Sequence, residues 1–94
     1  MARIRELGGQ VNYDRGGYEV SLAATPVENN DLAHLKHIAN LRHLDLRSTQ
    51  IDDGAIIHLQ ALTTLEDLQL ARSRFSPDGI AKLKTALPRT NVEK

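Results

Sequence analysis

The sequence repeats itself at an offset of 24 residues, without gaps. Apolar residues share columns at this offset, among them Val20, Leu44 and Leu68, then Leu22, Leu46 and Leu70, and then Leu35, Leu59 and Leu83. A column of small hydroxyl residues is aligned as well: Thr25, Thr49 and Ser73. Chance could align leucines in a chain that is 40% hydrophobic, but it would not also align a polar column. The chain is therefore predicted to be a repeat protein, in which each unit packs on its neighbours.

Each repeat is predicted to contain a short strand and then a helix. Residues 20–22, 44–46 and 68–70 alternate so that even positions point into the core and odd positions point out. Apolar residues spaced three apart follow and indicate one helix face: Leu32, Leu35, Ile38 and Leu41 in one repeat, and Ile56, Leu59, Leu62 and Leu65 in the next. Ser76 and Pro77 mark the start of the third helix, and the candidates for capping the other two are Asn29, Asn30, Asp52 and Asp53.

This order of elements restricts the fold to the α/β class. A strand that is followed by a helix and then by another strand requires a parallel sheet, with the helices on its other side. Because a helix is wider than the spacing between strands, the stack curves into a short right-handed arc with strands on the concave face and helices on the convex face.

The two ends of the chain depart from the repeat. Residues 2–7 predict a short helix that ends at Gly8 and Gly9, and a hairpin with its turn at residues 14–17 follows. At the other end, Arg89 replaces the expected leucine, while Val92 still falls in the strand column and predicts one last strand. We therefore expect a single domain, residues 1–94, with an N-terminal cap at 1–17, repeats at 18–41, 42–65 and 66–88, and a C-terminal cap at 89–94.

The pattern L-x-x-L-x-L-x-x-T-x-I-x-D-x-x-I-x-x-L over residues 41–59 resembles the leucine-rich repeat in its shorter, ribonuclease-inhibitor-like form. It is most similar to bacterial repeats of the T-x-I/V-x-D kind. The resemblance covers residues 18–87, and the opening IRELGGQV is similar to the segment that precedes such arrays. It implies a solenoid that binds other proteins with its concave sheet. Two departures are the hydroxyl column, where many relatives have asparagine, and the shortness of the array.

Composition excludes several classes of function. Twelve basic and twelve acidic residues give a formal net charge of zero, so no overall field draws in nucleic acid or an anionic membrane. The absence of cysteine excludes disulfides and thiolate metal sites. No apolar run approaches the ~18 residues of a membrane span. We expect a cytoplasmic protein with no cofactor.

The outward strand positions form a polar grid. Its central column contains Glu19, His43, Asp67 and Asn91, the next contains Ser21, Asp45, Gln69 and Glu93, and a third contains Ala23, Arg47 and Ala71. Four interpretations are open. The grid could be solvated charge pairing across strands, a polar binding face, a divalent metal site of His43, Asp45 and Asp67, or an acid and base pair.

Catalysis is the least favoured of these interpretations. His34 and His58 are 24 residues apart and precede Lys82 in the same column, but no carboxylate shares their spacing, so a solvated helix face is favoured over a metal site. No serine lies in a nucleophile motif. The expected function is a non-enzymatic module that binds a protein or peptide through seven concave residues, as a monomer or weak homodimer: Glu19, Ser21, His43, Asp45, Arg47, Asp67 and Gln69. The alternative is a structural, self-associating segment or a fragment of a longer repeat protein.

Overall fold

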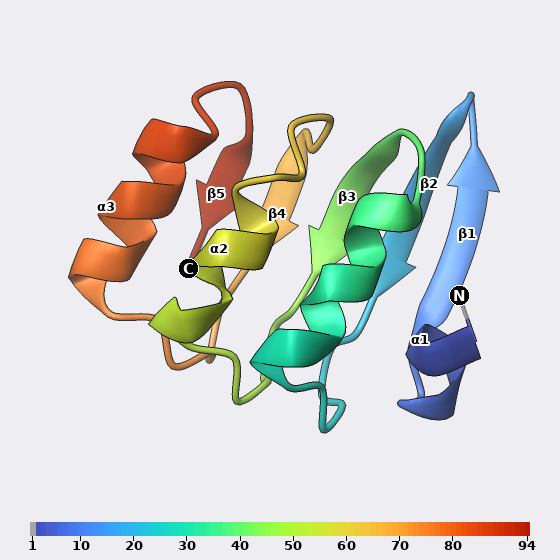
Figure 1. Cartoon of the computed structure of the whole chain (residues 1–94), viewed down its shortest axis with the longest axis horizontal. Coiled ribbons are helices and arrows are strands. Elements are labelled where there is room, and N and C mark those ends of the chain that lie inside the picture. The colour runs from blue at the N-terminus through green and yellow to red at the C-terminus, as the bar shows by residue number, and fades with distance from the viewer. Residues whose placement is uncertain (1) are drawn as a thin grey trace.

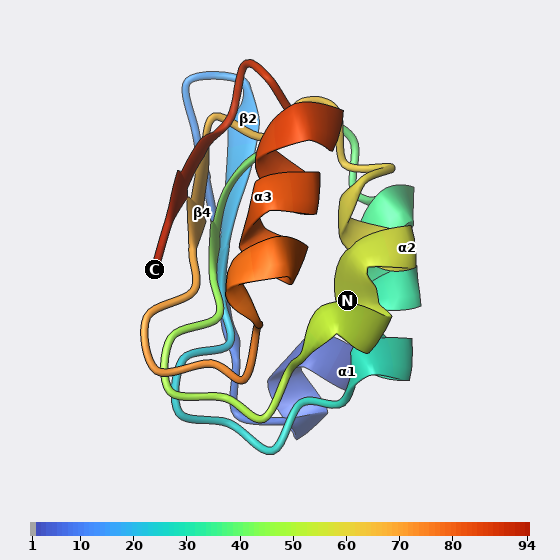
Figure 2. The same ribbon diagram turned by 90° about the vertical axis from the view of Figure 1, so that its left-hand side faces the viewer.

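The computed structural model describes residues 2–94 as two layers, a five-stranded sheet and a row of helices on one of its faces (Figures 1 and 2). The strands lie in chain order across the sheet: β1 (Gln10–Asp14), β2 (Gly17–Ser21), β3 (Leu41–Asp45), β4 (Asp67–Gln69) and β5 (Asn91–Glu93). The pair β1 and β2 is antiparallel, and the other three pairs are parallel. The α/β class, the hairpin and the last strand around Val92 are thereby confirmed. Met1, the first residue of the predicted N-terminal cap, lies outside the described residues.

The N-terminal end is a short helix that packs on the hairpin. Helix α1 (Ala2–Glu6) buries Ile4, and Gly8 follows it in the left-handed conformation with a φ of 92°. Arg15 and Gly16 form the tip of the hairpin, both with positive φ, as the tight turns that suit twisted strands require. The predicted helix end and turn are confirmed.

The helical layer differs from the prediction in its first two members. Only α3 (Pro77–Ala86) is a regular α-helix of ten residues, and its N-cap is Ser76, as expected. The first repeat instead has a 3₁₀ helix, η1 (Asn29–His37), and the second has η2 (Asp53–Ala55) followed by the four-residue α2 (Ile56–Leu59). The spacing fits the first and third repeats, because apolar residues exactly three apart share a face in a helix with three residues per turn, whereas Ile80, Leu83 and Leu87 follow the α-helical spacing of three and four.

An aliphatic core fills the space between the layers. Leu44 and Leu68 are at most 1% exposed, and so are Leu46 and Leu70, which lie just beyond the assigned strand ends. The backbone ladder continues there, since the N–H of Leu46 donates to the carbonyl of Gln69 at 2.9 Å. The inward column is therefore confirmed over three repeats. No helix of residues 2–94 has both the length and the apolar character needed to cross a membrane.

The hydroxyl column stabilises the turn that follows each strand. Thr25 and Thr49 donate to the carbonyls of Leu22 and Leu46, both at 2.7 Å, so each hydroxyl bonds within its own turn. Ser73 Oγ is buried without a partner among residues 2–94. The preceding position is left-handed in all three turns, with φ of 57°, 57° and 63° at Ala24, Ser48 and Arg72.

Neighbouring repeats are also joined at their helix starts. Asp52 accepts hydrogen bonds from Gly54 N in its own repeat at 2.9 Å and from Asn29 Nδ2 in the preceding one at 2.7 Å. One repeat later, Asp53 accepts hydrogen bonds from the backbone N and the hydroxyl of Ser76. Asn29 and Asn30 are not the N-cap of η1, which is Glu28. The side chain of Asn29 instead bonds to the N-cap of the next repeat.

Candidate binding face

The face of the sheet opposite the helices, called here the open face, presents two rows of polar side chains. The strand registers place the members of each row directly opposite one another. The central row is Asn12, Glu19, His43, Asp67 and Asn91, and the second row is Gln10, Ser21, Asp45, Gln69 and Glu93. Two of the three columns predicted from the 24-residue offset are therefore present in the strands, and β1 adds one residue to each. The third, which contains Ala23, Arg47 and Ala71, lies beyond the strand ends.

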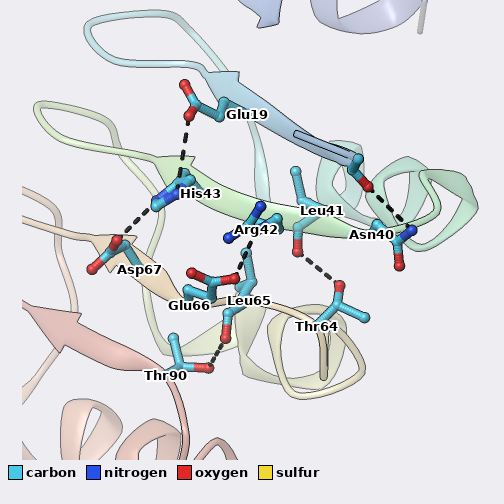
Figure 3. Close-up of polar contacts among 11 residues, drawn as sticks. Glu19, Asn40, Leu41, Arg42, His43, Thr64, Leu65, Glu66, Asp67 and Thr90 are labelled. Carbon is cyan, nitrogen blue, oxygen red and sulfur yellow. Dashed lines mark hydrogen bonds and ion pairs between the residues drawn. The ribbon is translucent and has the colours of Figure 1, made fainter. Parts of the chain in front are cut away.

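His43 lies at the centre of the open face, between carboxylates from the two adjacent strands (Figure 3). Its Nδ1 is 2.8 Å from Asp67 Oδ2, a hydrogen-bond distance, and its Nε2 is 4.0 Å from Glu19 Oε1, which is too long for one. Asn91 Nδ2 reaches the other oxygen of Asp67 at 3.4 Å and Glu93 at 2.7 Å. Three members of the row, His43, Asp67 and Asn91, are thus in polar contact along it.

Asp45 belongs to a separate pair. Its carboxylate accepts hydrogen bonds from Arg47 Nε at 2.9 Å, from Arg47 Nη2 at 2.8 Å and from the Arg47 backbone N at 3.0 Å. The hydrogen bonds from the Arg47 side chain hold the pKa of Asp45 below its ordinary value. Asp45 is therefore a carboxylate with its charge compensated by Arg47, two residues beyond the end of β3.

A β-bulge at the start of β3 places a second ion pair outside the central row. The register shifts between Tyr18 and Glu19, so Arg42 has no direct partner on β2 and His43 stands opposite Glu19. Arg42 Nε bonds to Glu66 at 2.6 Å, beside the central row (Figure 3). Its side chain covers Gly17, where a Cβ atom would lie 1.9 Å from Arg42 Cδ. Arg42 therefore makes its hydrogen bond to Glu66 and not to Glu19.

The strand starts are joined by threonine hydroxyls. Thr64 donates to the carbonyl of Leu41 at 2.7 Å, and Thr90 donates to the carbonyl of Leu65 at 2.8 Å (Figure 3). The first bond joins the segment before β4 to the start of β3, and the second joins the segment before β5 to the segment before β4. They fix the spacing of the strands that display the central row.

A hollow of about 250 Å³ lies in the open face over β2, β3 and β4. Six of the seven predicted site residues line it: Glu19, Ser21, His43, Asp45, Asp67 and Gln69. Arg47 does not, because its side chain lies with Ala23 and Ala71 around a different hollow. Asn12 also lines the first hollow and was missed from the sequence. The two-residue hairpin turn could have identified it, since that turn sets Asn12 opposite Glu19.

The described residues do not bring the suggested metal ligands together. Within residues 2–94 no group of three histidine or acidic side chains is arranged to hold a metal ion. His43 and Asp67 are in contact, but the carboxylate of Asp45 forms an ion pair with Arg47. His34 is exposed and His58 half-buried in the helical layer, and they form no such group either.

Comparisons with protein-family models, with curated proteins and with solved structures find no match for this chain. What the open face can bind therefore follows from its own side chains. It offers oriented hydrogen-bond groups and carboxylates on a layer of strands, without a deep cavity.

Proposed function

We propose that the chain is a short leucine-rich repeat array whose open face is the concave side of the solenoid, and that this face binds a protein or peptide without catalysing a reaction. The observation that carries the proposal is the central row, in which Asp67 lies 2.8 Å from His43 Nδ1 and accepts a hydrogen bond from Asn91. Side chains that are already held in place lose little conformational freedom when a partner binds.

Partial exposure of these side chains further supports binding. The side chains of Glu19, His43 and Asp67 are 47%, 39% and 36% exposed, so a partner can reach them. The same side chains have part of their surface packed against neighbours, which restricts their rotamers. A surface that is both accessible and ordered suits recognition of a complementary chain better than it suits chemistry, since no serine or threonine hydroxyl of residues 2–94 is hydrogen-bonded to His43.

Selection from a displayed peptide library against the immobilised domain tests the proposal. Selected peptides should shift backbone amide NMR signals of β2, β3 and β4 and leave those of α3 unchanged. Selected peptides that shift only α3 or η1 signals would contradict it.

Self-association is the second candidate. Within residues 2–94, β5 pairs only with β4, so the sheet has a free edge that another copy could extend. Light scattering on a sizing column at two concentrations about a hundredfold apart distinguishes the two. A constant monomer mass supports the binding module, and a mass that doubles with concentration supports self-association.

A further inference from the structure

The sheet has a second free edge at β1, which is longer than the edge at β5. Within residues 2–94, β1 pairs only with β2 and lies at the end of the sheet opposite β5 (Figure 1). It spans five residues without proline, lysine or arginine, which often protect an edge strand from pairing. The edge at β5 has three residues and is followed by Lys94. The β1 edge is therefore the less protected of the two.

The backbone groups that face out from this edge belong to Val11 and Tyr13. Tyr18 stands opposite Tyr13, but the N–H of Tyr18 donates away from β1, to the carbonyl of Asn40 at 2.9 Å. In an antiparallel pair, directly opposed residues alternate between those that exchange backbone hydrogen bonds and those that do not. Tyr13 therefore directs its N–H and C=O away from β2, and so does Val11, two residues earlier in the strand.

Two copies of β1 complement each other when they run antiparallel about Asn12. Val11 then stands opposite Tyr13 of the second copy, and the outward N–H and C=O groups of both residues find partners. These two cross-strand pairs each join a β-branched residue to an aromatic one on the helix side of the sheet, a favourable combination. On the open face, Gln10 stands opposite Asp14 of the second copy. An amide thus meets a carboxylate, and no like charges are opposed.

The side chain that this pairing would cover is exposed and already ordered. Tyr13 is 63% exposed, although its position in the strand points it to the helix side with the apolar residues. Its ring lies on Tyr18 with the ring centroids 4.8 Å apart and the planes at 60°. Val11 is half-buried and packs against the margin of the core. A ring that is held by a neighbour loses little freedom when a second surface covers it.

We infer that two copies of the chain associate through β1, antiparallel and centred on Asn12, into one continuous sheet. The two-fold axis is perpendicular to the sheet, so both helical layers lie on one side and both open faces on the other. This inference goes beyond the proposed function and is compatible with it, because the pairing leaves both open faces uncovered. It also differs from self-association through β5. Since either edge would give a mass that doubles with concentration, the test must locate the edge that pairs.

The chain contains no cysteine, so a single introduced thiol reports the pairing directly. The two copies of Asn12 would form a non-hydrogen-bonded pair with Cα atoms about 4.5 Å apart, a separation that a disulfide can span. Asn12→Cys should therefore give a covalent dimer in a glutathione redox buffer at least about tenfold faster than Gln10→Cys. Gln10 is the matched control, since it is exposed on the same face of β1 but its two copies would lie about 13 Å apart. Equal rates for the two variants would overturn the inference.

Light scattering of the cysteine-free chain at two concentrations about a hundredfold apart completes the test. The mass should rise toward that of a dimer at the higher concentration. Tyr13→Pro removes an outward N–H group and no hydrogen bond of the hairpin, and should prevent the rise. Asn12→Lys is a second variant, which places two ammonium groups opposite each other and should have the same effect.

Amide NMR signals of β3 and β4 that stay unchanged identify a variant that keeps the fold. A rise in mass that persists in such a variant would overturn the inference, because another surface would then be the interface. A monomer mass at both concentrations would overturn it as well. Peptide selection on the open face decides the proposed function separately.

Discussion

Asp53 and Ser76 lie in successive repeats, and the carboxylate of Asp53 accepts a 2.9 Å hydrogen bond from the backbone N of Ser76 and a second bond from its hydroxyl. The same hydroxyl accepts from Gly79 N at 3.0 Å and thereby caps α3. The start of α3 is thus held by the preceding repeat as well as by its own cap. The equivalent contact between Asn29 and Asp52 has the same form.

Gly79 provides the room for this contact. A Cβ atom at Gly79 would lie 2.2 Å from Asp53 Oδ1, so Gly79→Ala should displace the carboxylate and lower the free energy of unfolding. In an Asp53→Ala background the clash is gone, and the same Gly79→Ala change should stabilise the chain by about 0.5–1 kcal/mol, the ordinary helix preference of alanine. Urea unfolding of the four chains measures this reversal of sign. The same sign in both backgrounds would mean that Asp53 is not fixed by Ser76.

Removal of the N-cap of α3 should also have a measurable effect on the free energy of unfolding. Ser76→Ala should lower the free energy of unfolding by about 0.5–2 kcal/mol, because Gly79 N loses its acceptor. Thr85→Ala is the control, since Thr85 donates only to a carbonyl within α3 and is exposed. A larger loss for Thr85→Ala than for Ser76→Ala would contradict the capping role.

Acid should destabilise the fold through its surface carboxylates. Hydrogen bonds from the side chains of Arg47, Asn29, Ser76 and Arg42 lower the pKa values of Asp45, Asp52, Asp53 and Glu66, respectively. Carboxyls with a lower pKa in the folded than in the unfolded chain stabilise the fold above the unfolded pKa of about 4, and this is lost as the pH falls through the folded value. The urea midpoint should therefore stay constant from about pH 7 to about pH 5 and fall below about pH 4. A midpoint that rises on acidification would contradict these contacts.

At the left-handed position of the turn, substitution by glycine is predicted not to lower the free energy of unfolding. Ala24 has a φ of 57°, which costs a residue with a Cβ atom more than it costs glycine. Ala24→Gly should thus leave the free energy of unfolding unchanged or raise it by up to about 1 kcal/mol. Ala23→Gly, one residue earlier and without positive φ, should lower it by about 0.5–1 kcal/mol. Equal losses for both variants would argue against the turn conformation.

A substitution in the core is predicted to lower the free energy of unfolding more than the changes above. Leu46 is 0% exposed and lies mid-stack, so Leu46→Ala should lower the free energy of unfolding by about 2–5 kcal/mol. A melting experiment that gives less than about 1 kcal/mol would contradict the inward position of this column.

The rows of the open face could be predicted from the sequence because the two-residue alternation of a strand and the 24-residue repeat agree. Alternation along a strand separates Leu44 from His43 and Asp45, and the 24-residue offset places Asp67 beside His43. The bulge at Arg42 lies before the rows begin, so it did not alter them. The offset carries no information on β1, which is antiparallel and outside the repeat, and Asn12 was missed for this reason.

Side-chain pairing within the rows could not be predicted in the same way. Strand register sets which Cβ atoms are close, but rotamers decide which charges meet. Asp45 pairs with Arg47, just beyond the end of β3, and not with a residue on a neighbouring strand, because a planar guanidinium two residues away can bond to both oxygens. The type of helix could not be predicted either, because apolar residues at three-residue intervals fit a 3₁₀ helix as well as an α-helix.

The central claim, that the open face is the binding face, is tested most directly by one matched pair of variants. Gln69→Lys places a bulky cation in the hollow, and Gln60→Lys makes the same change at an exposed residue of the helical layer. The dissociation constant of a selected peptide is then measured for both by titration calorimetry. We predict at least a tenfold increase for Gln69→Lys, about 1.4 kcal/mol, and less than about a twofold change for Gln60→Lys. Equal effects, or a larger effect of Gln60→Lys, would contradict the claim.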